Sequence, residues 1–294
     1  MRKLQRLNNF IFTGSSLLYW SLTVAMLTLS GCGSSAPVAA TAQSKNDAPA
    51  DPAPAAEPEA PGVAAAYQAL KGMKVPVQRL EQNSLNVKGH VVRLQPRHIT
   101  SEGKVDEAVF AALKDVPNLF MGVDGTSIKD EGMEQISHLE HLKSLSMISC
   151  QDVTDAGFAH MANFKEVAAL YLNNTKITNE GMKSLRELKT LQDLNLFGTT
   201  ITDEGLENLE GLDNLASLSL ISCPDITNAG FKHLEKLTKL RTLWLINTKI
   251  GDEGIAFLSP QNPFEEVAFN NTKITAEGVS KFRKEFPGCV VVGK

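Results

Sequence analysis

Residues 194–215 read LNLFGTTITDEGLENLEGLDNL, and close copies of this segment recur before and after it at a nearly constant step. Each copy opens with two apolar residues separated by one other residue, as in Leu194-Asn195-Leu196. The first apolar residue of each copy falls at Val92, Met121, Leu145, Leu170, Leu194, Leu218, Leu243 and Val267, with steps of 29, 24, 25, 24, 24, 25 and 24 residues. An incomplete copy begins at Val290. This period predicts a stack of similar coils from about residue 91 to residue 294.

Each coil divides into a strand, a turn and a helix on physical grounds. The alternation around Leu194 predicts a strand that points both leucines into the core and the residue between them outward. A small residue then turns the chain and satisfies buried backbone groups; it is Thr126, Cys150, Thr175, Thr199, Cys223, Thr248 or Thr272. The segment Ile201–Gly205 buries its Ile, offers Thr or Asp as a helix N-cap, and uses Gly where helix and sheet approach. The helix expected next carries an apolar stripe at Leu206, Leu209, Leu212 and Leu215.

The copies that carry Cys read SLSMISCQDVTDAGF at 144–158 and SLSLISCPDITNAGF at 217–231. They resemble the cysteine-containing class of leucine-rich repeats familiar from F-box-type proteins, and the Thr-bearing copies resemble repeats of exported bacterial proteins. The resemblance implies an α/β fold: a right-handed leucine-rich-repeat solenoid, or horseshoe, with a parallel concave sheet, convex helices, about eight coils and terminal caps. The residues before the repeats do not resemble an F-box, so ubiquitin-ligase function is not expected.

A longer period lies above the first, because Leu145 and Leu218 are 73 residues apart and each opens a block that reads Cys-type, Thr-type, Thr-type. The array is therefore expected to have grown by duplication of a three-coil unit. His160 and His233 occupy the same slot in the two blocks. Their recurrence is explained by the duplication, without a metal site.

Residues 1–32 have the pattern of an export signal, with three basic residues in the first six positions, an apolar run and then Leu29-Ser30-Gly31-Cys32. They resemble a bacterial lipoprotein signal, which implies lipidation of Cys32 with fatty acyl chains such as palmitate. The alternative is an uncleaved transmembrane anchor of about 19 apolar-leaning residues. Either interpretation places the protein in the cell envelope; the lipoprotein one favours the outer membrane or periplasmic face.

The rest of the chain is expected to form three further parts. Residues 33–62 are dominated by Ala, Pro and small polar residues, which cannot bury enough apolar area to fold, so they are predicted to be a disordered tether. Residues 63–90 are predicted to cap the first coil, with a helix at 63–72 and a strand at 74–80 that Pro76 confines to a sheet edge. Residues 91–294 form the leucine-rich-repeat domain.

Composition and motifs narrow the classes of function. The formal net charge is −4, and loss of the three positive charges of the signal gives −7, which argues against a nucleic-acid partner and leaves membrane contact to the lipid anchor. No catalytic or phosphate-binding motif is present, and the recurrent acidic pairs mark helix starts, so we expect no enzyme activity, no cofactor and no metal. His138 and His141, spaced as i and i+3 on a helix, are only weak evidence for a metal site, and both side chains are expected to be solvated.

The cysteines of the repeats are not expected to form a disulfide. Cys150 and Cys223 lie in equivalent slots three coils apart, which is about 14 Å at the usual strand spacing and about twice the reach of a disulfide. Both are predicted to be small buried residues. Cys289, in the last coil, is left unpaired with no assigned role.

The candidate site is the concave face of the expected sheet, where the residues before, between and just after the leucines point. An apolar and aromatic strip, here called the inner strip, runs over five coils of this face and consists of Ile148, Tyr171, Phe197, Ile221, Trp244 and Ile246. Exposed contiguous apolar surface marks interaction sites, and Trp and Tyr often carry interface energy. We predict that a protein or peptide ligand binds there, with Asp193 and Glu266 at the polar rim.

The expected function is therefore that of a membrane-tethered, non-catalytic leucine-rich-repeat module for protein–protein interaction at the bacterial cell envelope. Two alternatives stay open: a structural spacer, or an envelope enzyme with an unrecognised site. The spacer interpretation predicts a featureless polar concave face; the apolar strip would then be partly covered by the neighbouring coil or by the tether.

Overall fold

The computed structural model describes residues 61–80, 83 and 88–293. The expected signal segment, the lipidation site Cys32 and nearly all of the expected tether lie outside the described residues. Among the residues that are described, no helix combines the length and the apolar character needed to span a bilayer.

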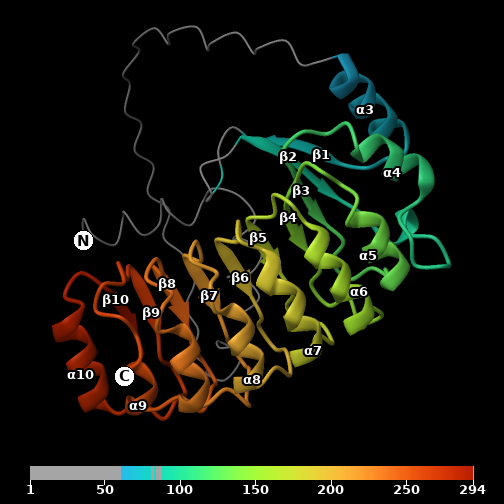
Figure 1. Ribbon diagram of the computed structural model, residues 1–294. Helices are drawn as coiled ribbons and strands as arrows, with labels where there is room; N and C mark the ends of the chain where they lie inside the picture. Colours follow the sequence, from blue (N-terminus) through green and yellow to red (C-terminus); the bar gives the residue numbers. More distant parts are fainter. Residues whose placement is uncertain (1–60, 81–82, 84–87, 294) are drawn as a thin grey trace, which may run out of the picture.

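One ten-stranded sheet runs through the described part of the chain, with its strands in sequence order from β1 to β10. The first two strands pair antiparallel, and every later neighbour is parallel. The strands are β1 (Val77–Leu80), β2 (Gly89–Arg93), β3 (Leu119–Gly122), β4 (Leu142–Ser146), β5 (Ala169–Tyr171), β6 (Asp193–Asn195), β7 (Ser217–Ser219), β8 (Thr242–Trp244), β9 (Glu266–Ala268) and β10 (Val290–Val292). Figure 1 shows the strands along the inner side of an arc and the helices along its outer side. This arrangement fits an α/β repeat solenoid.

The helices alternate with the strands and are short. The α-helices are α3 (Pro61–Gly72), α4 (Glu107–Leu113), α5 (Asp130–Ile136), α6 (Asp155–Ala159), α7 (Asn179–Met182), α8 (Asp203–Leu206), α9 (Asp252–Ile255) and α10 (Ala276–Glu285). The 3₁₀ helices are η1 (Pro96–His98), η2 (His160–Asn163), η3 (Lys183–Glu187), η4 (Glu207–Leu209) and η5 (Asn228–Leu234). Several coils therefore cross the outer side with one α-helical turn followed by a 3₁₀ turn.

The helix predicted after Gly205 is shorter than expected. It ends with η4, so Leu212 and Leu215 lie beyond it, on the way to β7. The four leucines of the predicted stripe are nevertheless fully buried. The spacing from Leu206 to Leu209 matches the three-residue period of the 3₁₀ turn, and Leu212 and Leu215 reach the core from the segment that follows it. The predicted burial was right and the predicted helix length was wrong.

The strand register predicted from the leucine pattern is confirmed. Leu170, Leu194 and Leu218 pair across adjacent strands, and each is 0% exposed. Because side chains alternate along a strand, the residues on either side of these leucines lie on the opposite, inner face of the sheet. This register therefore defines both the core and the candidate site.

The small residue predicted after the strand of each repeat, Thr or Cys, lies in the turn that follows the strand. Thr199 donates its hydroxyl to the carbonyl of Leu196 at 2.8 Å, and Cys223 donates its thiol to the same carbonyl from the next coil at 3.2 Å. The residue just before the slot takes a left-handed backbone, with φ of 52° at Asn174 and 68° at Gly198. Asn and Gly tolerate this region best, so the turn closes with little strain there.

The elements before the repeats include the helix and the edge strand expected from the sequence. Helix α3 covers the predicted helical segment, and its Leu70 is fully buried. Strand β1 begins directly after Pro76 and pairs only with β2, at the edge of the sheet. Val75, between the two elements, is 3% exposed. These residues extend the hydrophobic core past the first coil.

Candidate functional site

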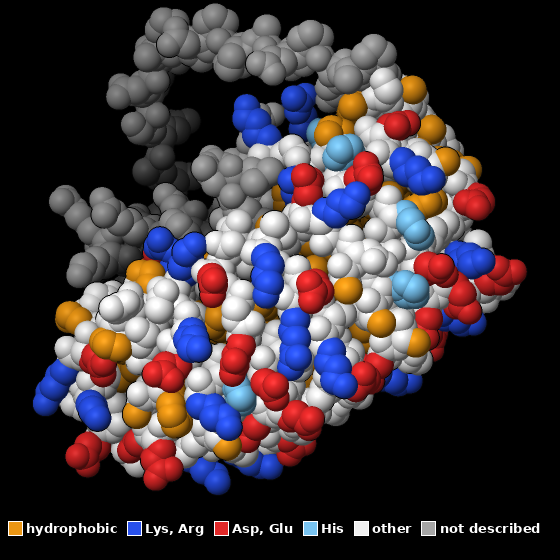
Figure 2. All heavy atoms as spheres, in the orientation of Figure 1, with side chains coloured by type: hydrophobic (Ala, Val, Ile, Leu, Met, Phe, Trp, Pro, Cys, Tyr) orange, Lys and Arg blue, Asp and Glu red, His pale blue; other side chains and the backbone are white. Residues whose placement is uncertain are grey.

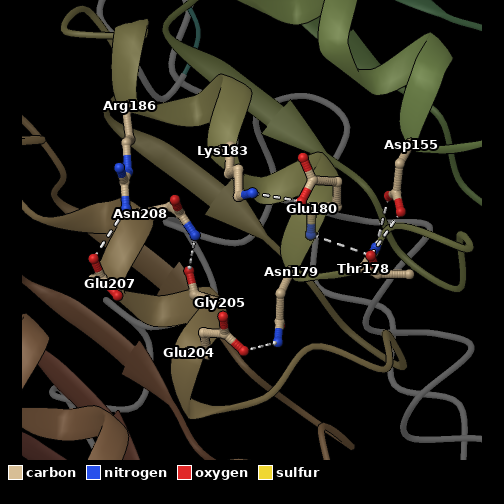
Figure 3. Close-up of polar contacts among 10 residues, drawn as sticks. All are labelled: Asp155, Thr178, Asn179, Glu180, Lys183, Arg186, Glu204, Gly205, Glu207 and Asn208. Carbon is tan, nitrogen blue, oxygen red and sulfur yellow. Dashed lines mark hydrogen bonds and ion pairs between the residues drawn. The ribbon is translucent and has the colours of Figure 1, made fainter.

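The outer side carries a repeated polar ladder between coils. The carboxylate of Asp155, at the start of α6, accepts hydrogen bonds from the backbone N–H of Thr178 at 3.0 Å and from its hydroxyl at 2.6 Å (Figure 3). We call this series the outer ladder; it is formed by Asp130, Asp155, Asn179, Asp203, Asn228 and Asp252, each bonded to the following coil. Thr178 in turn caps α7 by accepting from the N–H of Glu180. Thr is therefore the cap there, and Asp joins neighbouring coils.

The outer ladder explains why a glycine recurs near the start of the outer helix in each repeat. It corrects the expectation that this glycine is needed where helix and sheet approach. A Cβ added to Gly181 would lie 2.5 Å from Oδ1 of Asp155. The ladder side chain of the preceding coil is likewise met at Gly157, Gly205, Gly230, Gly254 and Gly278, whereas Gly132, in the first coil of the ladder, meets the carbonyl of Gly103. Glycine is needed because the ladder side chain of the preceding coil occupies the space, not because the helix approaches the sheet. Since the same contact recurs in coil after coil, these acids are structural.

The remaining outer surface shows mixed charges and no convergent chemistry. Figure 2 shows Lys, Arg, Asp and Glu interspersed over the helices, and pairs such as Lys183–Glu180 and Arg186–Glu207 are exposed and contribute little each. The residues described by the structure contain no group of three or more His, Cys, Asp or Glu arranged to hold a metal. His233 contacts the carboxylate of Glu210 at 2.5 Å.

The expected position of His138 and His141 on one helix is wrong. Helix α5 ends at Ile136, so both residues follow it in the turn that leads to β4. They line a hollow of about 420 Å³ together with Phe110, Lys114 and Glu140. Both histidines are exposed.

The cysteines of the described residues are free, as predicted for Cys150 and Cys223. Both are fully buried, and burial raises the pKa of the Cys150 thiol to about 11. A buried thiol with a raised pKa carries little thiolate and reacts slowly. Cys289 is half-buried, and burial followed by the charge of Glu266 raises its pKa to about 11. None of the three has the environment of a nucleophile.

The inner strip lies in two neighbouring rows across the parallel strands. The register aligns Tyr171 with Asn195, Ser219 and Trp244 on successive strands. The neighbouring row is formed by Ile148, Asn173, Phe197, Ile221 and Ile246, whose carbonyls accept backbone hydrogen bonds from the preceding coil. Every side chain of the predicted strip is half-buried, neither enclosed in the core nor fully exposed. Among the described residues, the exposed large apolar side chains are Phe257, Val290 and Val292, and none of them belongs to the inner strip. Binding along the inner strip stays a prediction.

Two aromatic–carboxylate pairs lie within the inner strip. The hydroxyl of Tyr171 on β5 donates to Oδ2 of Asp193 on β6 at 2.9 Å. The indole N–H of Trp244 on β8 donates to Oε1 of Glu266 on β9 at 3.1 Å. Asp193 and Glu266 were expected at the polar rim, and each accepts a hydrogen bond from an aromatic side chain; their role at a rim stays a prediction. Tyr171 and Trp244 are 73 residues apart, as are Asp193 and Glu266, so the two pairs occupy equivalent positions in the two three-coil blocks.

In the first pair, Asp193 is half-buried. Burial raises the pKa of Asp193, and hydrogen bonds from Tyr171 and Ser217 oppose the rise. No cation is among the causes of the shift. A carboxylate in this position is costly to ionise until a positive charge approaches it.

Two buried polar side chains on the inner face have no partner. Asn173 is 0% exposed and Ser219 is 1% exposed, and neither the amide of Asn173 nor the hydroxyl of Ser219 has a hydrogen-bond partner among the described residues. Unpaired buried polar groups are rare in folded proteins. The sequence pattern placed both residues on the concave face but did not indicate that they would be buried without partners.

Comparison with known proteins agrees with the repeat pattern. A family model described as Leucine Rich repeat matches residues 187–209, which cover the end of one coil and the start of the next. No curated protein matches the chain. The match, together with the sheet of mostly parallel strands and alternating helices, supports a leucine-rich-repeat protein. Leucine-rich-repeat domains are generally non-catalytic modules for protein interaction, which is consistent with a protein partner.

Proposed function

We propose that this protein is a membrane-tethered, non-catalytic leucine-rich-repeat module that binds a protein or peptide at the bacterial cell envelope, along the inner strip. The proposal includes a right-handed horseshoe of about eight coils, with the inner strip on its concave face. The observation that carries it is the half-buried band of apolar and aromatic side chains, which only a few small polar residues interrupt. Solvated strand positions in a sheet are ordinarily polar, whereas this band crosses five coils.

The two aromatic residues support the proposal through their geometry. Tyr171 and Trp244 each contact a carboxylate on the neighbouring strand, so their rings are held in place before a partner arrives. A side chain that is already ordered loses little conformational entropy on binding. Tyr and Trp are also the residue types that most often dominate interface energy.

The tethering part of the proposal rests on the sequence of residues 1–32. A diacylated or triacylated Cys32 would hold the protein stably on a membrane, favoured to be the outer membrane or the periplasmic face, where a single chain would hold it only marginally. Cys32→Ala should leave unprocessed precursor and abolish labelling with a fatty-acid probe. Normal labelling of the variant would contradict lipidation at this residue.

The interaction is tested by capture of partners from solubilised envelope on the full chain. Trp244→Ala and Phe197→Ala should each lose the partners that the wild-type chain retains. Phe257→Ala is the matched control, because Phe257 is 39% exposed and follows α9 on the outer side. Equal capture by all four proteins would refute binding along the inner strip.

One observation favours the structural spacer as the second candidate. The inner strip is half-buried rather than open, which is what a spacer with a covered face would show. A spacer would retain no specific partner, and its variants at Trp244 and Phe197 would behave like the control.

A further inference from the structure

We propose that the inner strip binds an extended peptide that carries two cationic side chains four residues apart, one at the Tyr171–Asp193 pair and one at the Trp244–Glu266 pair. This inference rests on the proposed function and names the chemistry of its partner. A peptide of this kind has Lys or Arg at positions i and i+4.

Each pair presents the groups that recognise an ammonium or guanidinium ion. An aromatic ring attracts a cation to its face, and a carboxylate accepts charge-assisted hydrogen bonds from it. The aromatic N–H or O–H occupies one carboxylate oxygen in each pair, Oδ2 of Asp193 and Oε1 of Glu266. Asp193 also accepts a hydrogen bond from Ser217, which a ligand cation beside the Tyr171 ring would share or displace.

The charge of the inner face is one-sided from β3 to β9, although Arg93 on β2 places a positive charge beyond that stretch. From β3 to β9, the positions before, between and after the core-facing residues include Asp124, Asp193 and Glu266 and no lysine or arginine. The nearest basic residues at the strand starts already have acidic partners, since Lys143 pairs with Glu166 and Arg241 pairs with Glu265. The rest of the surface mixes both signs. A basic ligand therefore complements this face better than an acidic one.

The desolvation of Asp193 points in the same direction. Its environment supplies hydrogen bonds from Tyr171 and Ser217 but no positive charge. A cation brought to this carboxylate would restore the favourable environment that burial removed. The same ion beside a fully solvated carboxylate would gain far less.

The distance between the pairs sets the spacing of the two cations. Tyr171 lies on β5 and Trp244 on β8, three strands away, which is about 14 Å at the usual separation of strands. An extended chain that crosses the strands rises about 3.4 Å per residue, so four residues span this distance. Residues i and i+4 of an extended chain also point to the same side, so both cations face the sheet.

The residue midway between the cations should be apolar. Position i+2 of the peptide points to the sheet as well, above β6 and β7, where Phe197 and Ile221 follow the strands. The distance between the pairs favours an extended main chain over a helix, because four residues of a helix span only about 6 Å.

The probe is the peptide N-acetyl-Gly-Lys-Ser-Leu-Ser-Lys-Gly-amide with a fluorophore, and its binding to the full chain is measured by fluorescence anisotropy. We expect replacement of either Lys by norleucine to weaken binding about tenfold. Asp193→Asn and Glu266→Gln, which keep the shape of the side chain, should each weaken the Lys peptide to a similar extent. Glu235→Gln, an exposed site at the end of η5, is the matched control and should bind like the wild type.

The outcomes separate this inference from the proposed function. If the norleucine peptide binds as tightly as the Lys peptide and Trp244→Ala abolishes both, the cation inference is wrong and the inner strip is still an interaction site. If no peptide of the series binds, or if Glu235→Gln weakens binding as much as Asp193→Asn, the inference is also overturned. The envelope capture experiment then decides the proposed function by itself. A variant that fails to fold does not remove the test, because the norleucine peptides probe the wild-type chain.

Discussion

The outer ladder and the inner strip lie on opposite sides of the same coils, and they use polar groups differently. In the outer ladder, each Asp or Asn bonds to the coil that follows, and the contact recurs with nearly constant spacing. On the inner face, the residue type changes from coil to coil. Two aromatic–carboxylate pairs join residues of the inner strip to Asp193 and Glu266, and the buried side chains of Asn173 and Ser219 have no partner among the described residues. Chemistry that repeats in each coil stabilises the stack, whereas chemistry that is not repeated is the better candidate for recognition.

The largest expected change in stability tests the strand register, which decides which residues face the core and which face the inner side. Leu194→Ala should lower the free energy of unfolding by about 2 to 5 kcal/mol, because it removes a fully buried side chain and leaves a cavity. Urea denaturation measures the change, with Val292→Ala, an exposed position, as the control. A loss below about 1 kcal/mol would mean that Leu194 does not face the core, so that the inner face has been assigned to the wrong residues.

The next effect concerns the fit of the outer ladder. Gly181→Ala places a Cβ 2.5 Å from Oδ1 of Asp155, so we expect a loss of about 1 to 3 kcal/mol of unfolding free energy from overpacking. Gly72→Ala, at the end of α3 where an added Cβ meets nothing within 4 Å, is the control and should be neutral or stabilising. If both variants behave alike, the glycine is not required by the ladder.

The hydrogen bonds of the ladder give a third comparison. Asp155→Ala leaves the N–H and hydroxyl of Thr178 without their acceptor, and a loss of about 1 to 3 kcal/mol is expected. Asp155→Asn should lose much less, because Asn179 fills the same slot in the next coil and accepts from the N–H of Thr202 at 3.0 Å. Thermal denaturation of the two variants tests this. Equal losses would show that the ladder needs a charge rather than an acceptor.

The smallest expected effect lies on the inner face and depends on pH. The pKa of Asp193 is raised by burial, so the folded state holds this proton more tightly than the unfolded state does. The protonated side chain of Asp193 makes its full contribution to stability at pH values below the pKa that it has in the unfolded state. This contribution is lost as pH rises through the pKa that it has in the folded state. Asp193→Asn should therefore be more stable than the wild type at neutral pH, and this difference should disappear in acid. Asp152→Asn, at an exposed carboxyl, is the control for urea titrations at several pH values.

The strands and the core could be predicted because the pattern that encodes them is local. Leu194 and Leu196 alternate with one other residue, and this period leaves a single choice of inward face. The slot at Thr199 was equally clear, since a small residue recurs there. The helices were less predictable: the apolar spacing around Leu206 did not show that the α-helix ends after one turn and continues as η4.

The contacts between coils could not be read from a single copy. The outer ladder joins Asp155 to Thr178, which are 23 residues apart, and the sequence alone suggested only that an acid sits at a helix start. The aromatic–carboxylate pairs likewise join residues 22 apart. Their signal was present as the same offset at Tyr171 and Trp244. Recognising it required the parallel register that places one residue of each coil beside its neighbour.

The most direct test of an interaction site on the inner face is photocrosslinking in the cells that produce the protein. The photoreactive residue p-benzoylphenylalanine replaces Phe197 on the inner strip in one variant and the exposed Phe257 on the outer side in another. We expect a defined crosslinked partner from position 197, lost when Trp244 is also changed to Ala, and none from position 257. Absence of a crosslink at 197, or the same products from both positions, would contradict the account.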